Sequence, residues 1–260
     1  MADNKGIGDK IRATQAWKSI FRHGPPNNPR NRTAVMRENV FLHLHPIKTR
    51  RSAAKIGYSW CMGGLSFFTF ITLTVTGLLL MFYYRPTAEY AYNDMIALRE
   101  HVPLGIMREL HRWGAHAMVI TVWIHMFRVF MTGSYKAPRE FNWTIGVFLL
   151  VLTLLLSFTG YLLPWDQLAI WAITVGTNMA KATPFLGHGG PGAGLMQIGD
   201  FVMVGDKNDI RFQLLGGRFV GEPALLRFYI LHCVFIPMVI GVFMVVHFWR
   251  VRKDGFSGPL

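Results

Sequence analysis

The sequence predicts an all-α membrane protein, a transmembrane four-helix bundle, from its composition and its apolar runs. Of its 260 residues, 52% are hydrophobic and only 16% are charged, whereas soluble domains carry roughly a quarter charged residues. Four apolar runs each reach the length of about 20 residues that a helix needs to cross a bilayer. They cover residues 56–84, 110–132, 143–163 and 225–249.

Basic residues predict the orientation of these spans. Four spans place both termini on one side, and the segments on that side hold 18 of the 27 Lys and Arg residues but only 5 of the 14 Asp and Glu residues. Lys and Arg collect on the cytoplasmic side of membrane proteins, so we expect both termini on the cytoplasmic, negative side. The net charge of +13 is therefore expected at a membrane surface and not on nucleic acid.

Two further parts of the chain are predicted from their composition. Residues 1–55 form a basic N-terminal surface segment, either a surface helix on anionic lipid or a partly ordered tail. Residues 56–260 form the four-helix membrane domain. The outer loop, residues 164–223, is too long for a plain connection, and its glycine-rich run 187–192 is not expected to be regular structure. We expect this loop to cover a site at the outer surface.

Histidines within the spans carry the chemistry, since ionisable residues there are functional by default. His111 and His125 are 14 residues apart in the second span, and His232 and His247 are 15 apart in the fourth. Each pair faces roughly one side of its helix, about 21–22 Å apart along the axis. The two helices run parallel, so His111 pairs with His232 near the outer surface and His125 with His247 near the inner surface. His116 points about 140° away from His111 and is excluded as a ligand.

Two such pairs suit two haems, each held by two imidazoles. Polar histidines bonded between helices would explain one residue, but four in parallel pairs favour haem. Glycines support this: Gly63 and Gly77 in the first span, and Gly146 and Gly160 in the third, are again 14 apart. Glycine lets a flat macrocycle approach the backbone, although small residues also serve helix packing.

Several longer motifs carry a specific resemblance. They are Phe82-Tyr83-Tyr84-Arg85-Pro86-Thr87, His111-Arg112-Trp113, His125-Met126-Phe127-Arg128-Val129, Thr132-Gly133, Pro138-Arg139-Glu140, Thr159-Gly160-Tyr161, Leu163-Pro164-Trp165-Asp166-Gln167, Arg227-Phe228-Tyr229, Leu231-His232 and Ser257-Gly258-Pro259-Leu260. With these motifs residues 56–260 resemble the N-terminal type of cytochrome b domain, in the short four-helix form called cytochrome b6 that occurs in Rieske–cytochrome b complexes.

The resemblance implies a function. Quinol is oxidised near the outer surface, one electron passes to a Rieske iron–sulfur protein, and the other crosses through two b haems to an inner quinone site. Protons are released outside and taken up inside. A Pro-Glu-Trp-Tyr motif of longer cytochromes b does not occur in this sequence. A separate three-helix subunit of the C-terminal type should supply it, beside a c-type cytochrome, in a homodimeric complex, so we expect no quinol turnover by this subunit alone.

The resemblance also assigns single residues. A cysteine at the place of Cys61 holds an additional haem by one thioether, and an arginine at the place of Arg252 lies beside that haem; otherwise Cys61 is a small packing residue. Pro164, Trp165 and Asp166 border the quinol oxidation site, or they end a helix with an interfacial Trp. Nothing acidic in the N-terminal segment matches the family's proton-uptake residue, so His43 or His45 could relay protons, or both could be plain surface histidines.

Three arginines lie near the expected haem levels. Arg108, Arg112 and Arg128 could pair with haem propionates, because a guanidinium binds carboxylates through two parallel hydrogen bonds. They could instead extend to the membrane surface.

Three other classes of protein share part of this pattern. A di-haem membrane anchor of a dehydrogenase or hydrogenase would share the histidines but not the Pro-Trp-Asp and Ser-Gly-Pro-Leu stretches. A transporter or channel would carry more polar residues in its spans. A basic adaptor or assembly factor would bind no haem.

Overall fold

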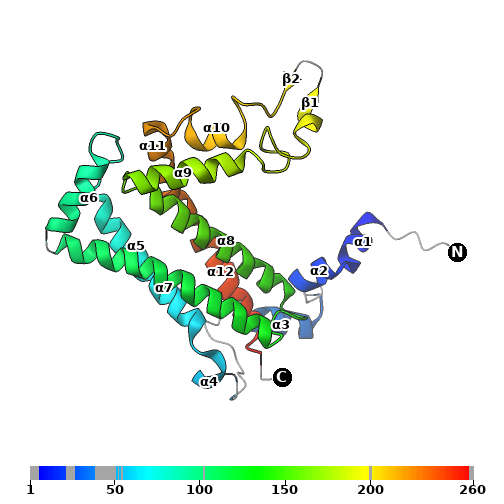
Figure 1. The fold of residues 1–260 in the computed structure, drawn as a ribbon. Coiled ribbons are helices and arrows are strands. Elements are labelled where there is room, and N and C mark those ends of the chain that lie inside the picture. The colour runs from blue at the N-terminus through cyan, green and yellow to red at the C-terminus, as the bar shows by residue number, and fades with distance from the viewer. Residues whose placement is uncertain are drawn as a thin grey trace. The chain divides into compact units, whose positions relative to one another are not determined.

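The structure, a computed structural model, describes residues 6–21, 27–38, 51, 53, 55–101, 103–198 and 201–257. His43 and His45 lie outside these residues. The regular secondary structure of the described chain is helical apart from one two-residue antiparallel pair, β1 (Gln197–Ile198) with β2 (Phe201–Val202) (Figure 1). The shorter helices are α1 (Ile7–Ala13), α2 (Gln15–Ile20), α3 (Pro29–Glu38), α4 (Ile56–Ser59), α6 (Ala91–Glu100), α9 (Gln167–Ala180), the 3-10 turn η1 (Ala193–Met196) and α10 (Ile210–Leu215).

Four helices of the described chain are long and apolar enough to cross a membrane. They are α5 (Met62–Met81), α7 (Leu104–Met131), α8 (Glu140–Leu162) and the continuous stretch Glu222–Asp254, made of α11 (Glu222–Ile230), η2 (Leu231–Phe235) and α12 (Ile236–Asp254). The prediction of an all-α protein with four membrane spans is confirmed. Large apolar side chains such as Phe68 and Val75 are 66% and 53% exposed in the chain alone, which suits lipid or helices of other chains.

The first span is shorter than predicted. We expected it to begin at Ile56, but α4 ends at Ser59 and α5 begins at Met62. The two residues between them, Trp60 and Cys61, have positive φ angles of 51° and 53°. A left-handed backbone costs non-glycine residues energy and cannot continue a right-handed helix, so the chain turns there.

The second span begins earlier than predicted, at Leu104 and not at residue 110. Its first turns carry an ionic cluster, in which Arg108 and Arg112 both bind Glu109, at 2.8 Å and 2.5 Å. Glu109 and Arg112 are three residues apart, a spacing at which ion pairs stabilise a solvated helix. The helix therefore continues beyond the apolar run.

The fourth span contains one wide turn. Residues Leu231–Phe235 form a π-helical turn, η2, which includes His232. Such a turn accommodates one extra residue in an α-helix and is frequent at functional sites. It takes up one residue of the 15-residue spacing between His232 and His247, which makes that spacing equivalent to the 14 residues of the second span.

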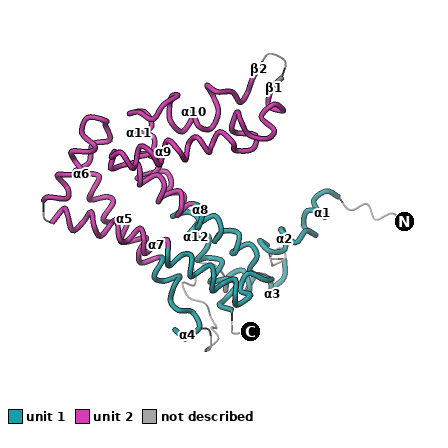
Figure 2. The backbone as a smooth tube through the Cα atoms, in the orientation of Figure 1, with its two compact units in different colours: residues 1–66, 120–151, 240–260 teal, residues 67–119, 152–239 magenta. Residues whose placement is uncertain are grey.

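The chain divides into two compact units (Figure 2). Unit 1 comprises residues 1–66, 120–151 and 240–260, and unit 2 comprises residues 67–119 and 152–239. Unit 1 contains His125 and His247, and unit 2 contains His111 and His232. Each predicted histidine pair therefore lies within one unit.

Unit 2 holds an apolar core between α9, α10 and α11. Ile173 of α9, Leu215 of α10 and Phe228 of α11 are at most 1% exposed. The Tyr84 hydroxyl, also in this core, donates to the Leu163 carbonyl at 2.6 Å, and burial raises the pKa of this phenol. The long outer loop thus contains two helices in addition to irregular chain.

The glycine-rich part of that loop is a series of turns, as predicted. A Cβ atom at Gly187 would collide with the carbonyl of Lys181, and Gly192 has a φ of +82°, which suits glycine. His188 at the tip binds Asp209 at 2.5 Å. Asp209 is 1% exposed and also caps α10, accepting from the Phe212 N–H at 2.8 Å.

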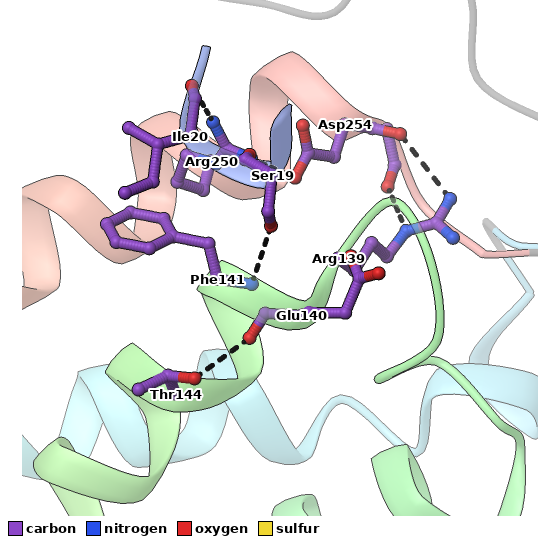
Figure 3. A network of polar contacts seen from close by, with 9 residues as sticks. Ser19, Ile20, Arg139, Glu140, Phe141, Thr144, Arg250 and Asp254 are labelled. Atoms are coloured by element: carbon purple, nitrogen blue, oxygen red, sulfur yellow. Dashed lines mark hydrogen bonds and ion pairs between the residues drawn. The ribbon is translucent and has the colours of Figure 1, made fainter. Parts of the chain in front are cut away.

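In unit 1 the helix α2 is hydrogen-bonded to the start of α8 and to the end of α12 (Figure 3). The fully buried guanidinium of Arg250 donates to the carbonyls of Ser19 and Ile20, the last residues of α2. It also pairs with Asp254 at 3.3 Å. The Ser19 hydroxyl accepts from the Phe141 N–H at the start of α8, at 3.1 Å. These bonds fix α2 against the start of α8 and the end of α12.

Candidate haem sites

The outer pair consists of His111 on α7 and His232 in the wide turn η2. Their ring centres are 6.2 Å apart with an interplanar angle of 71°. Two imidazoles that share one metal ion each bind it through a ring nitrogen at about 2 Å, which separates their ring centres by about 6 Å. The pair therefore has the separation that bridging a single metal ion requires.

Hydrogen bonds to Nδ1 determine which ring nitrogen stays free in both histidines of the outer pair. The Nδ1 atom of His111 is 2.9 Å from the Thr76 hydroxyl, and this hydroxyl donates its own proton to the Thr72 carbonyl at 2.8 Å. The oxygen of Thr76 must therefore accept from Nδ1–H of His111. This tautomer leaves Nε2 of His111 with a free lone pair, the arrangement of metal-ligating histidines.

His232 is oriented in the same way from α8. Its Nδ1 lies 3.1 Å from the Leu156 carbonyl and 3.3 Å from the Thr159 hydroxyl. Thr159 donates to the Leu155 carbonyl at 2.9 Å, so it also accepts from the imidazole. Thr76 and Thr159 are each 3% exposed. Thr76 was not named from the sequence, and Thr159 was named only within the motif Thr159-Gly160-Tyr161, without a role, although each directly precedes one of the paired glycines.

The inner pair consists of His125 on α7 and His247 on α12. Their ring centres are 6.4 Å apart with an interplanar angle of 79°, so this pair also fits two ligands of one metal ion. The backbone of Asn142 lies beside His247. Met62 and Ile145 stand before the inner glycines in place of the two threonines.

The four predicted glycines each face one of the four histidines. A Cβ atom at Gly160 would lie 2.6 Å from Cε1 of His232, closer than real Cβ atoms come, and one at Gly77 would lie 3.1 Å from Cε1 of His111. At Gly63 the corresponding distance to His125 is 3.1 Å, and at Gly146 the distance to His247 is 3.8 Å. The missing side chains of these glycines therefore leave space for the imidazole rings.

This donor set fits a haem better than a bare metal ion. Among the described residues no group of three or more His, Cys, Asp and Glu side chains could hold a metal. A haem carries most of the donors to its iron itself, so the protein would need to supply only histidine ligands such as these paired imidazoles. The two pairs, His111 with His232 and His125 with His247, match that need.

The arginines expected near the haems differ in their partners. Arg108 and Arg112 bind Glu109, and Arg128 donates to the Tyr58 carbonyl at 3.1 Å. In contrast, Nε and Nη1 of Arg252 are buried and have no hydrogen-bond partner among the described residues. Buried polar groups are normally paired, so Arg252 is the arginine best placed to receive an anionic group.

Cys61 lies in the left-handed turn before α5. Its backbone N–H donates to the Ser59 hydroxyl at 3.3 Å, and its Sγ atom lies 3.9 Å from the same oxygen. The side chain is exposed. It is accessible for a covalent bond and is not a buried packing residue. Cys233 is half-buried, as expected for a cysteine that packs as a small apolar side chain.

Pro164, Trp165 and Asp166 form the turn between α8 and α9. Asp166 caps α9 by accepting from the Ala169 N–H at 2.8 Å, and Trp165 has a positive φ of 53°. Trp165 and Asp166 also line an open pocket of about 490 Å³ with Tyr92, Gln167 and Leu168. The segment therefore ends a helix and borders a pocket at once.

The chain is similar to known proteins over most of its length. The family model Cytochrome b/b6/petB matches residues 47–189. Cytochrome b6 of Prochlorococcus marinus (strain MIT 9515) is 39% identical over 202 residues, 77% of this chain and 84% of that protein. Cytochrome b6 of Gracilaria tenuistipitata var. liui is 40% identical over 202 residues, 77% and 85% of the two chains. Cytochrome b6 of Heliomicrobium gestii is 36% identical over 217 residues, 83% and 91% of the two chains.

Solved structures share the fold. Among them is a chain of a hyperthermophilic respiratory complex III, with a TM-score of 0.64 and 24% identity. The similarity covers 97% of this chain but only 56% of that longer chain. On the family match and the identities to the cytochromes b6, the protein described here belongs to the cytochrome b/b6 family.

Proposed function

We propose that the chain carries electrons across the membrane between an outer quinol oxidation site and an inner quinone reduction site. As a member of its family it is a haem-binding electron-transfer subunit of a quinol oxidoreductase complex, and it is an integral membrane protein. The proposed path across the membrane is supported by two pairs of imidazoles, each pair with ring centres just over 6 Å apart. His111 with His232 would hold the outer b haem, and His125 with His247 the inner one.

The chain's own residues would position these groups. A bound haem supplies one-electron chemistry at its iron. Thr76 and Thr159 hold the outer imidazoles with Nε2 free, and Gly77 and Gly160 give these rings room. Apolar side chains of the spans exclude water. The low polarity around a haem and the hydrogen bonds to its histidine ligands both tune its reduction potential. Protons would be released at the outer surface and taken up at the inner one.

Cys61 would carry an additional haem through a single thioether. The thiol is exposed, and the resemblance matches Cys61 to the family's haem-binding cysteine. Arg252 would bind an acidic group of that haem, which would give its buried, unpartnered nitrogens an acceptor.

Quinol would be oxidised near the pocket beside Trp165 and Asp166. That step needs other chains: a three-helix subunit of the C-terminal type, a Rieske iron–sulfur protein and a c-type cytochrome, in a homodimeric complex. Both termini would lie on the cytoplasmic side.

The test is a pyridine haemochrome assay of the purified complex beside a haem stain of the denatured subunit. We expect two b haems per chain and a stained band that Cys61→Ser abolishes. Two b haems without stain would remove the thioether but keep the electron-transfer proposal. Absence of b haem from freshly isolated complex would overturn the proposal.

A further inference from the structure

The turn that carries Cys61 has a strained backbone. Trp60 and Cys61 are consecutive residues other than glycine, and their φ angles are 51° and 53°. Such a conformation persists only where the surrounding structure holds it. On one side the turn leads directly into α5, where the Leu65 N–H donates to the Cys61 carbonyl at 2.9 Å. On the other side it depends on the short helix α4.

Tyr58 fixes α4 to two other parts of unit 1. Its carbonyl accepts from Nε of Arg128 at 3.1 Å, and the same guanidinium lies 4.1 Å from the centre of the Tyr58 ring. Its hydroxyl lies 3.0 Å from the Ser257 hydroxyl, beyond the end of α12. Because Tyr58 is three residues before Cys61, these contacts hold the chain where it enters the strained turn.

The Tyr58 hydroxyl is the first of four hydroxyls in a chain. Ser257 lies 2.5 Å from Ser134, and Ser134 lies 2.8 Å from Thr132. Thr132 donates its proton to the Arg128 carbonyl at 2.9 Å, so it accepts from Ser134. Each hydroxyl has one proton to donate. Ser134 therefore accepts from Ser257, and Ser257 accepts from the phenol of Tyr58.

Ser257 is held in place without the help of Tyr58. Gly255 ends α12 with a φ of +71°, which turns the chain away from the helix. Arg139 donates to the carbonyls of Asp254 and Gly255, at 3.4 Å and 3.2 Å (Figure 3). The phenol of Tyr58 thus binds an acceptor that other residues have already placed.

We propose that Tyr58 is a positioning residue for Cys61, and that its bond to Ser257 holds the turn in the conformation in which the thiol forms the thioether. The inference rests on the proposed function, which assigns an additional haem to Cys61. The thiol would add across a carbon–carbon double bond at the haem edge. An S–C and a C–H bond form, the S–H bond and one π bond break, and no electrons are exchanged. Such a reaction depends on where the thiol is held.

The first experiment compares Tyr58→Phe with Tyr135→Phe. Phenylalanine at position 58 keeps a ring beside Arg128 and removes only the hydroxyl, whereas the Tyr135 ring packs on Phe130 in the same unit. The readout is the haem stain of the denatured subunit relative to the b haem of the purified complex. This ratio should fall about threefold or more in Tyr58→Phe and stay unchanged in Tyr135→Phe. An unchanged ratio in Tyr58→Phe, or a parallel loss of b haem, would overturn the inference.

The second experiment changes the acceptor. Ser257→Ala should lower the stain as Tyr58→Phe does, and Ser257→Thr, which keeps a hydroxyl, should retain it. The double variant Tyr58→Phe/Ser257→Ala should lose no more than either single variant, because both changes remove the same bond. Additive losses, or equal loss in the alanine and threonine variants, would contradict the positioning role.

The same samples separate this inference from the proposed function. Stain that none of these substitutions changes refutes only the role of Tyr58. Two b haems without stain in the unsubstituted chain would remove the thioether, and this inference with it, but would keep the electron-transfer proposal.

Discussion

The outer and inner histidine pairs have nearly the same spacing but different support. Their ring centres are 6.2 Å and 6.4 Å apart, and their interplanar angles are 71° and 79°. The outer rings each bind a buried threonine that precedes a paired glycine, whereas Met62 and Ile145 occupy those places at the inner pair. The comparison shows that ligand spacing is set along the helices, while ring orientation is set locally by neighbouring helices.

Removing one ligand should give the largest effect and test whether the pairs are independent. His232→Leu should reduce the haem content from two b haems to one and leave the inner haem, because the two pairs lie in separate units. His247→Leu should do the reverse. A redox titration followed by absorbance identifies the surviving haem. Loss of both haems from either variant would show that the sites are coupled.

Glycine substitutions should separate the two pairs next. Gly160→Ala should strongly reduce outer haem content, because its Cβ would lie 2.6 Å from the His232 ring. Gly146→Ala should keep nearly full inner haem content, because its Cβ would lie at an ordinary contact distance of 3.8 Å from the His247 ring. Haem content per purified chain measures both. Equal losses would mean that the glycines serve the haem and not the imidazole.

Threonine substitutions should sharpen the comparison within the outer pair. Thr76→Val removes the hydroxyl that holds His111, and loss of such support typically lowers metal affinity by about 10–100-fold. Thr159→Val should cost less, because the Leu156 carbonyl still accepts from His232 at 3.1 Å. The rate of haem transfer to a competing haem-binding protein reports the affinity. A larger effect at Thr159 would contradict this ranking.

Lowering the pH should have the smallest effect, a loss of stability around Asp94 and Asp209 in unit 2. Arg85 hydrogen bonds hold the pKa of Asp94 below its usual range. Burial acts to raise the pKa of Asp209, but bonds from the Phe212 N–H and His188 outweigh it and lower this pKa. Both carboxylates therefore stabilise the fold above the usual value of about 4, and this contribution is lost as pH falls through the lowered values.

Limited digestion with pepsin between about pH 5 and about pH 2 can test this dependence. Cleavage of the 181–215 region should rise as the pH falls. In Asp209→Asn that region should already be cut at the upper end of the range. Acid-independent cleavage of the unsubstituted protein would contradict the assignment.

The sequence predicted the features that depend on periodicity. The four spans, the pairing of His111 with His232 and of His125 with His247, and the glycine positions all follow from spacing along helices. The roles of Thr76 and Thr159 as partners of the histidines were not predicted. A threonine in an apolar helix usually bonds its own backbone, and only tertiary packing brings its oxygen to a histidine. The repeated Thr-Gly pair in the first and third spans was the available signal.

Boundaries and buried polar contacts were less predictable. Neither residue at the break, Trp60 and Cys61, is Gly or Pro. The first span was therefore predicted to begin too early in the sequence. The outer loop was expected to be irregular in part, but the apolar face of α9 is buried by α10 and α11, which local sequence does not reveal. The clamp of Arg250 on Ser19 and Ile20 joins residues more than 200 positions apart.

The wide turn at Leu231–Phe235 has a consequence for how such proteins vary. A single residue added to a helix normally rotates everything beyond it by about 100°, which would turn one ligand away from its partner. Placed within a π turn, the addition is absorbed at once. The spacing of the ligands is thus counted in helical turns and not in residues, and deleting Cys233 should return the helix to regular α geometry with both histidines still facing their partners.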